Sequence, residues 1–179
     1  MSMKTTVYVV CHGDKHKGTN PGMTVEGYDQ ISLLRPLLPA ILPLIICGAG
    51  KRHENVRKAL GFNYLPTIWT PSVGGPESLE KIQGKDMVIL ADGMTVPLEN
   101  FPVGDDRTAA MLAVLKTAPD NAVICAGRPA MISLGVKDAK SAAVYRINIY
   151  CQGITGTLTL DNLEIQEVKA TGVAEAGTV

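Results

Sequence analysis

The sequence lacks an excess of charge of either sign. Lys and Arg together number 17, as do Asp and Glu, so the formal net charge is zero. A chain without net positive charge has no long-range field that attracts nucleic acid or an anionic membrane, and we expect neither as a partner. Aromatic residues are also scarce, at 4%. The core must therefore be built mainly from Val, Ile, Leu and Ala.

The sequence also lacks long apolar runs, a signal peptide pattern and a cysteine framework. The longest apolar stretch, 37–47, is interrupted by Pro39 and Pro43 and is too short to cross a bilayer. The N-terminus does not show the basic, apolar and small-residue regions of a signal peptide. Scattered cysteines favour reduced thiols, and hence a cytoplasmic protein. The four cysteines are Cys11, Cys47, Cys125 and Cys151.

What the sequence contains is a series of short β-favouring runs that alternate with helical segments. Its 179 residues predict a single domain, 1–179, with a flexible tail at 170–179. The alternation predicts an α/β fold, a three-layer α/β/α sandwich with a mixed, mostly parallel central sheet. The predicted strands are 5–10, 43–47, 67–70, 87–90, 122–125, 142–150, 157–160 and 163–168. The predicted helices are 24–35, 52–60 and 105–116, with a helical turn at 77–82.

Three of the predicted strands end in turns that carry glycine with histidine or arginine. We expect strands 7–10, 44–47 and 123–125 to be adjacent and parallel. The carboxyl ends of parallel neighbours meet at one edge of the sheet, where ligands of such folds bind. This arrangement brings His12, Arg52 and Arg128 together. Guanidinium groups and the backbone N–H groups of Gly13 and Gly127 suit phosphate oxygens, and a neutral imidazole can attack phosphorus. The pattern therefore predicts a phosphate site.

The stretch from Val7 to Gln30 resembles the opening of the histidine phosphatase, or phosphoglycerate mutase-like, superfamily. That family has a strand, Arg-His-Gly, and then Leu-Thr-x-x-Gly-x-x-Gln at the start of the first helix. This chain has Cys11-His12-Gly13 and Met23-Thr24-Val25-Glu26-Gly27-Tyr28-Asp29-Gln30. The short spacing between the two motifs is most similar to that of the small phosphohistidine phosphatases. The resemblance implies that His12 is the catalytic nucleophile and that Arg52 is the second phosphate-binding arginine.

The departures from the family pattern concern its catalytic groups. Cys11 replaces the first arginine, and Ala126 stands where the second catalytic histidine is expected. The resemblance thus implies a degraded phosphate pocket with weak or absent phosphomonoester hydrolysis through His12. Its phosphate-binding residues would be Gly13, Arg52, Gly127 and Arg128. The general acid is not identified, although the loop carboxylates Asp92 and Glu99 lie near the place where the family often has one.

Other interpretations remain open at this point. A non-catalytic protein that binds a phosphorylated small molecule or a phosphoprotein shares the same fold. Cys11, His12, Asp14 and His16 are dense enough to form a metal site, although alternate residues at a strand end point in opposite directions. Cys11 is either an inert thiol or a reactive thiolate.

A nucleotide-binding loop at 48–51 is excluded by its spacing. The phosphate loop requires Gly-x4-Gly-Lys-Ser/Thr, and here Ile45 and Arg52 occupy its first and last places. We expect no cofactor and no metal ion.

Overall fold

The structure of the protein is a computed structural model. It describes residues 3–18, 21–48, 50–70, 73, 80–82, 85–89, 95–97, 105–151 and 156–169. The strands are β1 (Met3–Cys11), β2 (Ile45–Cys47), β3 (Thr67–Trp69), β4 (Glu80–Ile82), β5 (Lys85–Ile89), β6 (Thr95–Pro97), β7 (Val123–Ala126), β8 (Val144–Cys151) and β9 (Leu163–Val168). The α-helices are α1 (Val25–Ser32), α2 (Lys51–Ala59), α3 (Asp105–Thr117) and α4 (Arg128–Ser133), and the short 3-10 helices are η1 (Arg35–Leu37) and η3 (Leu160–Asn162).

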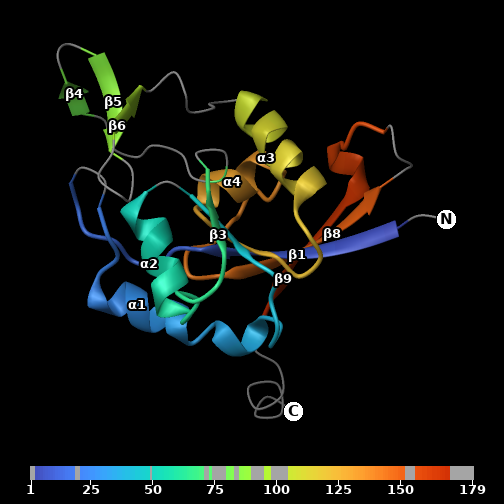
Figure 1. The fold of residues 1–179 in the computed structure, drawn as a ribbon, viewed down its shortest axis with the longest axis horizontal. Helices are drawn as coiled ribbons and strands as arrows, with labels where there is room; N and C mark the ends of the chain where they lie inside the picture. The colour runs from blue at the N-terminus through green and yellow to red at the C-terminus, as the bar shows by residue number, and fades with distance from the viewer. Residues whose placement is uncertain are drawn as a thin grey trace.

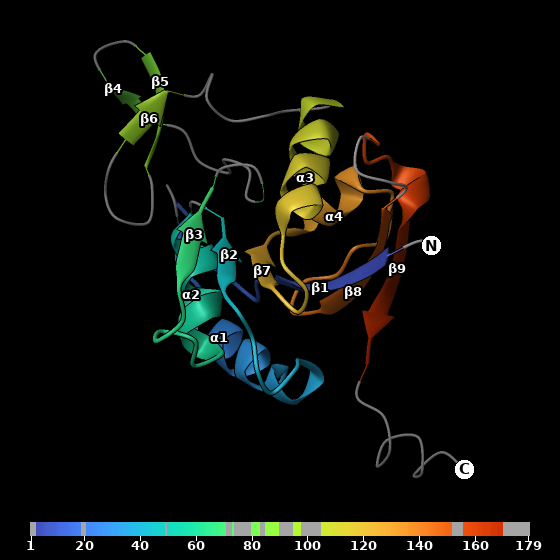
Figure 2. The ribbon, with the colours of Figure 1, turned by 45° about the vertical axis from the view of Figure 1, so that its right-hand side comes forward.

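A six-stranded sheet forms the centre of the fold, in the order β3-β2-β7-β1-β8-β9. The strands β3, β2, β7 and β1 are parallel to one another. Strand β8 is antiparallel to β1, and β9 is antiparallel to β8. Helices α1 and α2 lie on one side of this sheet and α3 and α4 on the other (Figures 1 and 2). The predicted three-layer sandwich with a mixed, mostly parallel sheet is confirmed. The predicted adjacency of β1, β7 and β2 is confirmed as well.

Apolar clusters on both faces of the sheet explain the three layers. Because side chains alternate along a strand, Val7, Val9 and Cys11 pack into the cluster beneath α3 and α4, whereas Val10 packs into the cluster beneath α1 and α2. All four of these side chains are fully buried. A strand buried on both faces reads as a continuous apolar run, as the sequence of β1 does. The helix residues that close the two clusters include Met111, Leu115 and Met131 on one side and Ile31, Val56 and Leu60 on the other.

The middle of the chain differs from the sequence prediction. The predicted strand 87–90 corresponds to β5, which pairs with β4 and β6 in a separate three-stranded antiparallel sheet. Residues 80–82 of the predicted helical turn form β4 instead, and 77–79 lie outside the described residues. The predicted strand is confirmed over 87–89, but an apolar run of four or five residues does not by itself reveal which sheet it joins.

The C-terminal part is also corrected at one element. Residues 157–159 are irregular and η3 follows, so the predicted strand 157–160 does not form. Strands β8 and β9 pair directly over Val144–Ile149 and Leu163–Val168, which leaves no ladder for an intervening strand. The predicted flexible tail, 170–179, lies outside the described residues. Within the part of the chain that the structure describes, no helix is long and apolar enough to cross a bilayer.

Candidate active site

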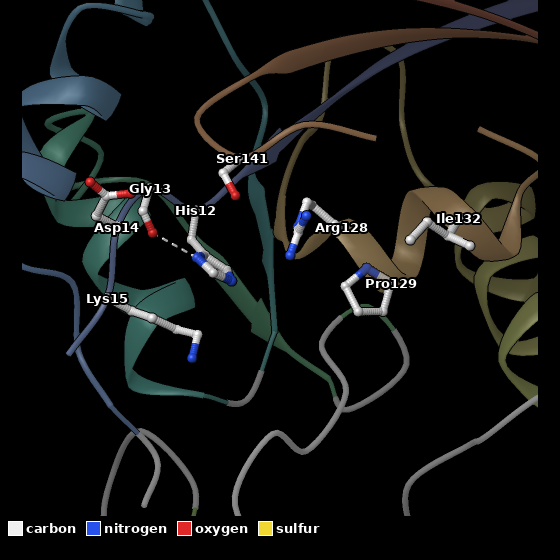
Figure 3. Close-up of a pocket in the computed structure, with 8 residues that line it drawn as sticks. All are labelled: His12, Gly13, Asp14, Lys15, Arg128, Pro129, Ile132 and Ser141. Carbon is white, nitrogen blue, oxygen red and sulfur yellow. Dashed lines mark hydrogen bonds between the residues drawn. The ribbon is translucent and has the colours of Figure 1, made fainter. Parts of the chain in front are cut away.

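A cavity of about 520 Å³ opens at the carboxyl end of β1, beside the start of α4 (Figure 3). In the close-up, Asp14 and Lys15 lie on one side of the His12 ring, and Arg128, Pro129 and Ile132 follow on the other. The lining residues come from the turn after β1, from α4 and from the loop before β8. They are His12, Gly13, Asp14, Lys15, Arg128, Pro129, Ile132 and Ser141.

The His12 ring is held in one orientation by the backbone. Its Nδ1 lies 2.8 Å from the carbonyl oxygen of Gly13. A carbonyl oxygen only accepts hydrogen bonds, so Nδ1 carries the proton and donates it. In the neutral ring, Nε2 then holds the lone pair. The backbone of His12 is fixed on both sides as well, because its N–H donates to Ala126 (3.1 Å) and its carbonyl accepts from Ala142 (3.0 Å).

The Thr-x-x-Gly-x-x-Gln motif fixes the turn that carries His12. Thr24 caps α1 by accepting from the Gly27 N–H (3.1 Å), and the Thr24 N–H donates to the Asp14 carbonyl (2.9 Å). Gln30 accepts from the Asp14 N–H (3.0 Å) and donates to the Asp14 carboxylate (3.2 Å). A Cβ on Gly27 would overlap the Asp14 carbonyl oxygen, so only glycine allows the turn to lie this close to the helix. The motif therefore acts as a clamp on residues 12–14.

Positive charge in the cavity comes from Lys15 and Arg128. Arg128, which the sequence predicts to bind phosphate, lies on the cavity wall. Burial raises the pKa of the Cys11 thiol to about 12, and the nearby Arg128 charge opposes this rise. Cys11 is thus a neutral, buried thiol, whereas Arg128 brings a cation to the same end of the strand.

Arg52 is not a surface residue, but it does not line the cavity. Arg52 lies in the first turn of α2, and only 2% of its surface is exposed. A Cβ on Gly50 would lie 2.8 Å from a terminal nitrogen of the Arg52 guanidinium, which places that group against the turn between β2 and α2. Arg52 is therefore not among the residues that line this cavity, and its predicted role in phosphate binding stays a prediction.

His53 is a further neighbour of His12, and nothing in the sequence pattern marks it. Its ring centroid is 5.8 Å from that of His12, in an edge-to-face arrangement. It is fully buried, and its Nδ1 accepts from the Gly50 N–H (3.2 Å). A Cβ on Gly48 would lie 2.6 Å from the same Nδ1. Glycine at this position therefore makes room for the ring.

The residue that faces His12 from the end of β7 is Gly127 rather than Ala126. A Cβ built on Gly127 would lie 3.6 Å from His12 Nε2, an ordinary contact distance. The Ala126 side chain is fully buried in the cluster beneath α3 and α4. The expectation that Ala126 takes the place of a second histidine is therefore shifted by one residue. A histidine meant to face His12 would have to stand at 127.

The alternative metal site does not form. Among the described residues, no group of three or more His, Cys, Asp or Glu side chains could hold a metal ion. Cys11 is buried in the core, whereas Asp14 and His16 are exposed, because consecutive residues at the strand end point in different directions. The carboxylates considered as general acids, Asp92 and Glu99, lie outside the described residues.

Several cavity residues have no signal in the sequence. Ser141 comes from the loop before β8, 129 positions after His12. Lys15 lies in the turn after β1 and Ile132 lies in α4, but nothing in the sequence around either residue marks it as a cavity residue. A local pattern records which side chains follow a strand. It does not record which loop from elsewhere covers them.

No protein-family model and no curated protein matches the sequence. Solved structures do match over nearly the whole chain. The alpha-ribazole phosphatase from Shigella flexneri is 12% identical with a TM-score of 0.59, covering 92% of this chain and 96% of its own. A proposed phosphohistidine phosphatase SixA from Nakamurella multipartitia is 14% identical with a TM-score of 0.57, covering 94% and 96%. The mycobacterial glucosyl-3-phosphoglycerate phosphatase is 10% identical with a TM-score of 0.57, covering 92% and 97%.

These similarities confirm the fold that the opening motif implied. The chain shares the fold of these phosphatases. At this level of identity, the matches describe the architecture. The chemistry has to be argued from the residues of the cavity.

Proposed function

We propose that the cavity binds the phosphate group of a phosphomonoester against His12, and that hydrolysis through His12 is weak or absent. The observation that carries this proposal is the hydrogen bond from His12 Nδ1 to the Gly13 carbonyl oxygen. It gives Nε2 the lone pair that a nucleophile needs at phosphorus.

The charges on the cavity wall support an anionic ligand. Arg128 offers a guanidinium fork, and Lys15 adds a second cation on the other side of His12. The Ser141 hydroxyl adds a polar group to the wall. The Gly13 N–H, in contrast, already donates to Met23 Sδ (3.2 Å). Because the chain has no net charge, there is no long-range steering, and the affinity should be modest and fall with added salt.

Weak turnover follows from the groups that are missing around His12. Cys11 is a neutral thiol where the family has an arginine, and Gly127 presents no side chain to Nε2. Removing one group that stabilises transition-state charge typically costs about 10²–10³ in rate. Two such losses leave binding largely in place, because Arg128 and Lys15 remain, while they slow the transfer of the phosphoryl group.

A non-catalytic binding protein is the second candidate, and the same two positions favour it. In that case, the cavity holds a phosphorylated small molecule or a phosphoprotein without forming a covalent bond to His12.

The three described free thiols, Cys11, Cys47 and Cys125, support a place in a reducing compartment such as the cytoplasm. We also propose that the chain acts as one domain.

Calorimetric titration with phosphate or tungstate tests the binding site. The His12→Ala and Arg128→Ala variants should each weaken the anion at least several-fold. His16→Ala and Lys17→Ala are matched controls, because both side chains are exposed and neither lines the cavity. If Arg128→Ala binds the anion with wild-type affinity, Arg128 is not part of the site. Unchanged binding in both cavity variants would overturn the proposed function.

Turnover of p-nitrophenyl phosphate tests the degraded pocket, and slow turnover that is lost in His12→Ala favours the weak enzyme over the non-catalytic binding protein. We expect slow or undetectable hydrolysis by the wild type and an increase of about 10² or more in Gly127→His. Gly127 has extended backbone angles, φ −120° and ψ 171°, so a side chain is tolerated there. Gly127→Ala is the control, because it adds the Cβ without the imidazole. Wild-type turnover as fast as that of ordinary phosphatases would contradict the proposal of a degraded pocket.

A further inference from the structure

The far side of the cavity carries an apolar side chain that the phosphate chemistry does not use. Ile132 lines the cavity and is 50% exposed, whereas its helix neighbours Ala130 and Met131 are buried. Large exposed apolar side chains occur at several places in the described part of the chain, but Ile132 alone among them lies on this wall. Pro129, from the first turn of the same helix, lines the cavity next to it.

The groups around His12 are arranged in order across the cavity. Lys15 and Asp14 lie on one side of the imidazole, and Arg128 lies on the other side, with Pro129 and Ile132 beyond it (Figure 3). A phosphate held between the two cations leaves its ester group toward Asp14, toward Ser141, or toward Pro129 and Ile132. The Asp14 carboxylate is charged and exposed, and the Ser141 side chain is a hydroxyl, so neither matches an apolar group. Pro129 and Ile132 form the part of the lining that offers apolar contact.

We infer that the ligand of this cavity is a phosphomonoester with an apolar or aromatic ester group, which packs on Pro129 and Ile132. This inference rests on the proposed function, since it takes the phosphate position from it. A sugar phosphate in this orientation would place hydroxyl groups against Pro129 and Ile132, whose side chains offer no hydrogen bond, which leaves polar groups poorly matched. An aromatic ring instead removes the exposed surface of Ile132 from water.

Two phosphonates that differ only in their organic group test the inference by titration calorimetry. Methylphosphonate reports on the anion site alone, and phenylphosphonate reports on the anion site and the wall together. In the wild type, phenylphosphonate should bind about tenfold more tightly, as expected for burial of a small apolar group. In Ile132→Ala, this ratio should fall to about two, with methylphosphonate affinity unchanged. Glucose 6-phosphate should bind no more tightly than methylphosphonate.

The controls separate failure of this inference from failure of the proposed function. Leu160→Ala removes another exposed apolar side chain, 44% exposed in η3 and absent from the cavity lining, and should leave both affinities unchanged. Equal binding of the two phosphonates in the wild type, or an unchanged ratio in Ile132→Ala, overturns the apolar subsite. If Arg128→Ala still weakens both ligands, the phosphate site stands alone. If neither phosphonate binds, the proposed function and this inference both fail.

Discussion

At the scale of single residues, Cys11 is buried at the position where the resembling family has an arginine. Burial raises the pKa of its thiol to about 12. At neutral pH, the side chain carries no charge and is not a nucleophile. The sequence left open whether Cys11 is inert or reactive. Its environment favours the inert thiol.

We predict that Cys11 resists alkylation by iodoacetamide in the folded protein at pH 8. The side chain is fully buried and its thiolate is not populated, so modification should require unfolding. Site-resolved mass spectrometry in the absence and presence of urea measures this. Cys125, also fully buried, is an internal comparison. Rapid labelling of Cys11 without urea would show a reactive thiolate and would reopen the thiol chemistry.

The sequence predicted part of the site at this scale. His12, Gly13 and Arg128 line the cavity, and the sequence singled them out because each comes within two residues of the end of a buried strand. Ser141 was missed because the loop that carries it is placed by the pairing of β8, far along the chain. The second histidine position was misplaced by one residue, because a sequence pattern does not show to which face a strand-end residue turns.

At the scale of elements, α1 positions the active-site turn through Gly27. Alanine in place of a helical glycine normally stabilises a protein by about 1 kcal/mol. Here the added Cβ would overlap the backbone carbonyl of Asp14, which cannot move aside as a flexible side chain would. Overpacking of this kind costs about 1–3 kcal/mol. The overlap should therefore outweigh the gain in helix propensity.

We predict that Gly27→Ala lowers the free energy of unfolding by about 1–2 kcal/mol and weakens phosphate binding. Urea denaturation and titration calorimetry measure the two effects. Ser32→Ala, at an exposed position in the last turn of the same helix, is the control and should change stability by less than about 0.5 kcal/mol. A more stable Gly27→Ala protein with wild-type affinity would show that the turn adapts to the methyl group.

Elements differed in how well the sequence revealed them. The strands β1, β2 and β7 were predicted because they are buried on both faces, which leaves only apolar residues along them. The run 87–90 was assigned to the main sheet because its composition is the same, although it pairs with β4 and β6. Composition reports burial and β propensity, and the pairing partner depends on the rest of the chain.

At the scale of the whole molecule, buried acidic groups set the stability at alkaline pH. Burial raises the pKa of Cys11 from 9.0 to about 12 and raises that of Cys47 well above its ordinary value, and the Tyr145 pKa is raised as well. Each group keeps its proton in the folded state at pH values where the unfolded chain has lost it. The unfolded state then binds fewer protons, so stability falls as the pH rises.

We predict that the free energy of unfolding is nearly constant from pH 7 to 8 and falls above pH 9. The Cys11 thiol alone should lower it by about 1 kcal/mol between pH 8 and 10. Urea denaturation at both pH values measures the decline. In Cys11→Ala the decline should be smaller by about that amount, whatever the absolute stability of the variant. An identical decline in both proteins would mean that Cys11 is solvated in the native state.

The position of β1 in the sheet has a consequence for synthesis of the chain. It is made before both of its neighbours in the sheet, β7 and β8, with Tyr8 opposite Val123 and Val10 opposite Val144. Closing loops of more than 100 residues delays such pairings. On the ribosome, β1 therefore has both sheet partners only after Val144–Cys151 has emerged, and the turn that carries His12 stays incompletely supported until then.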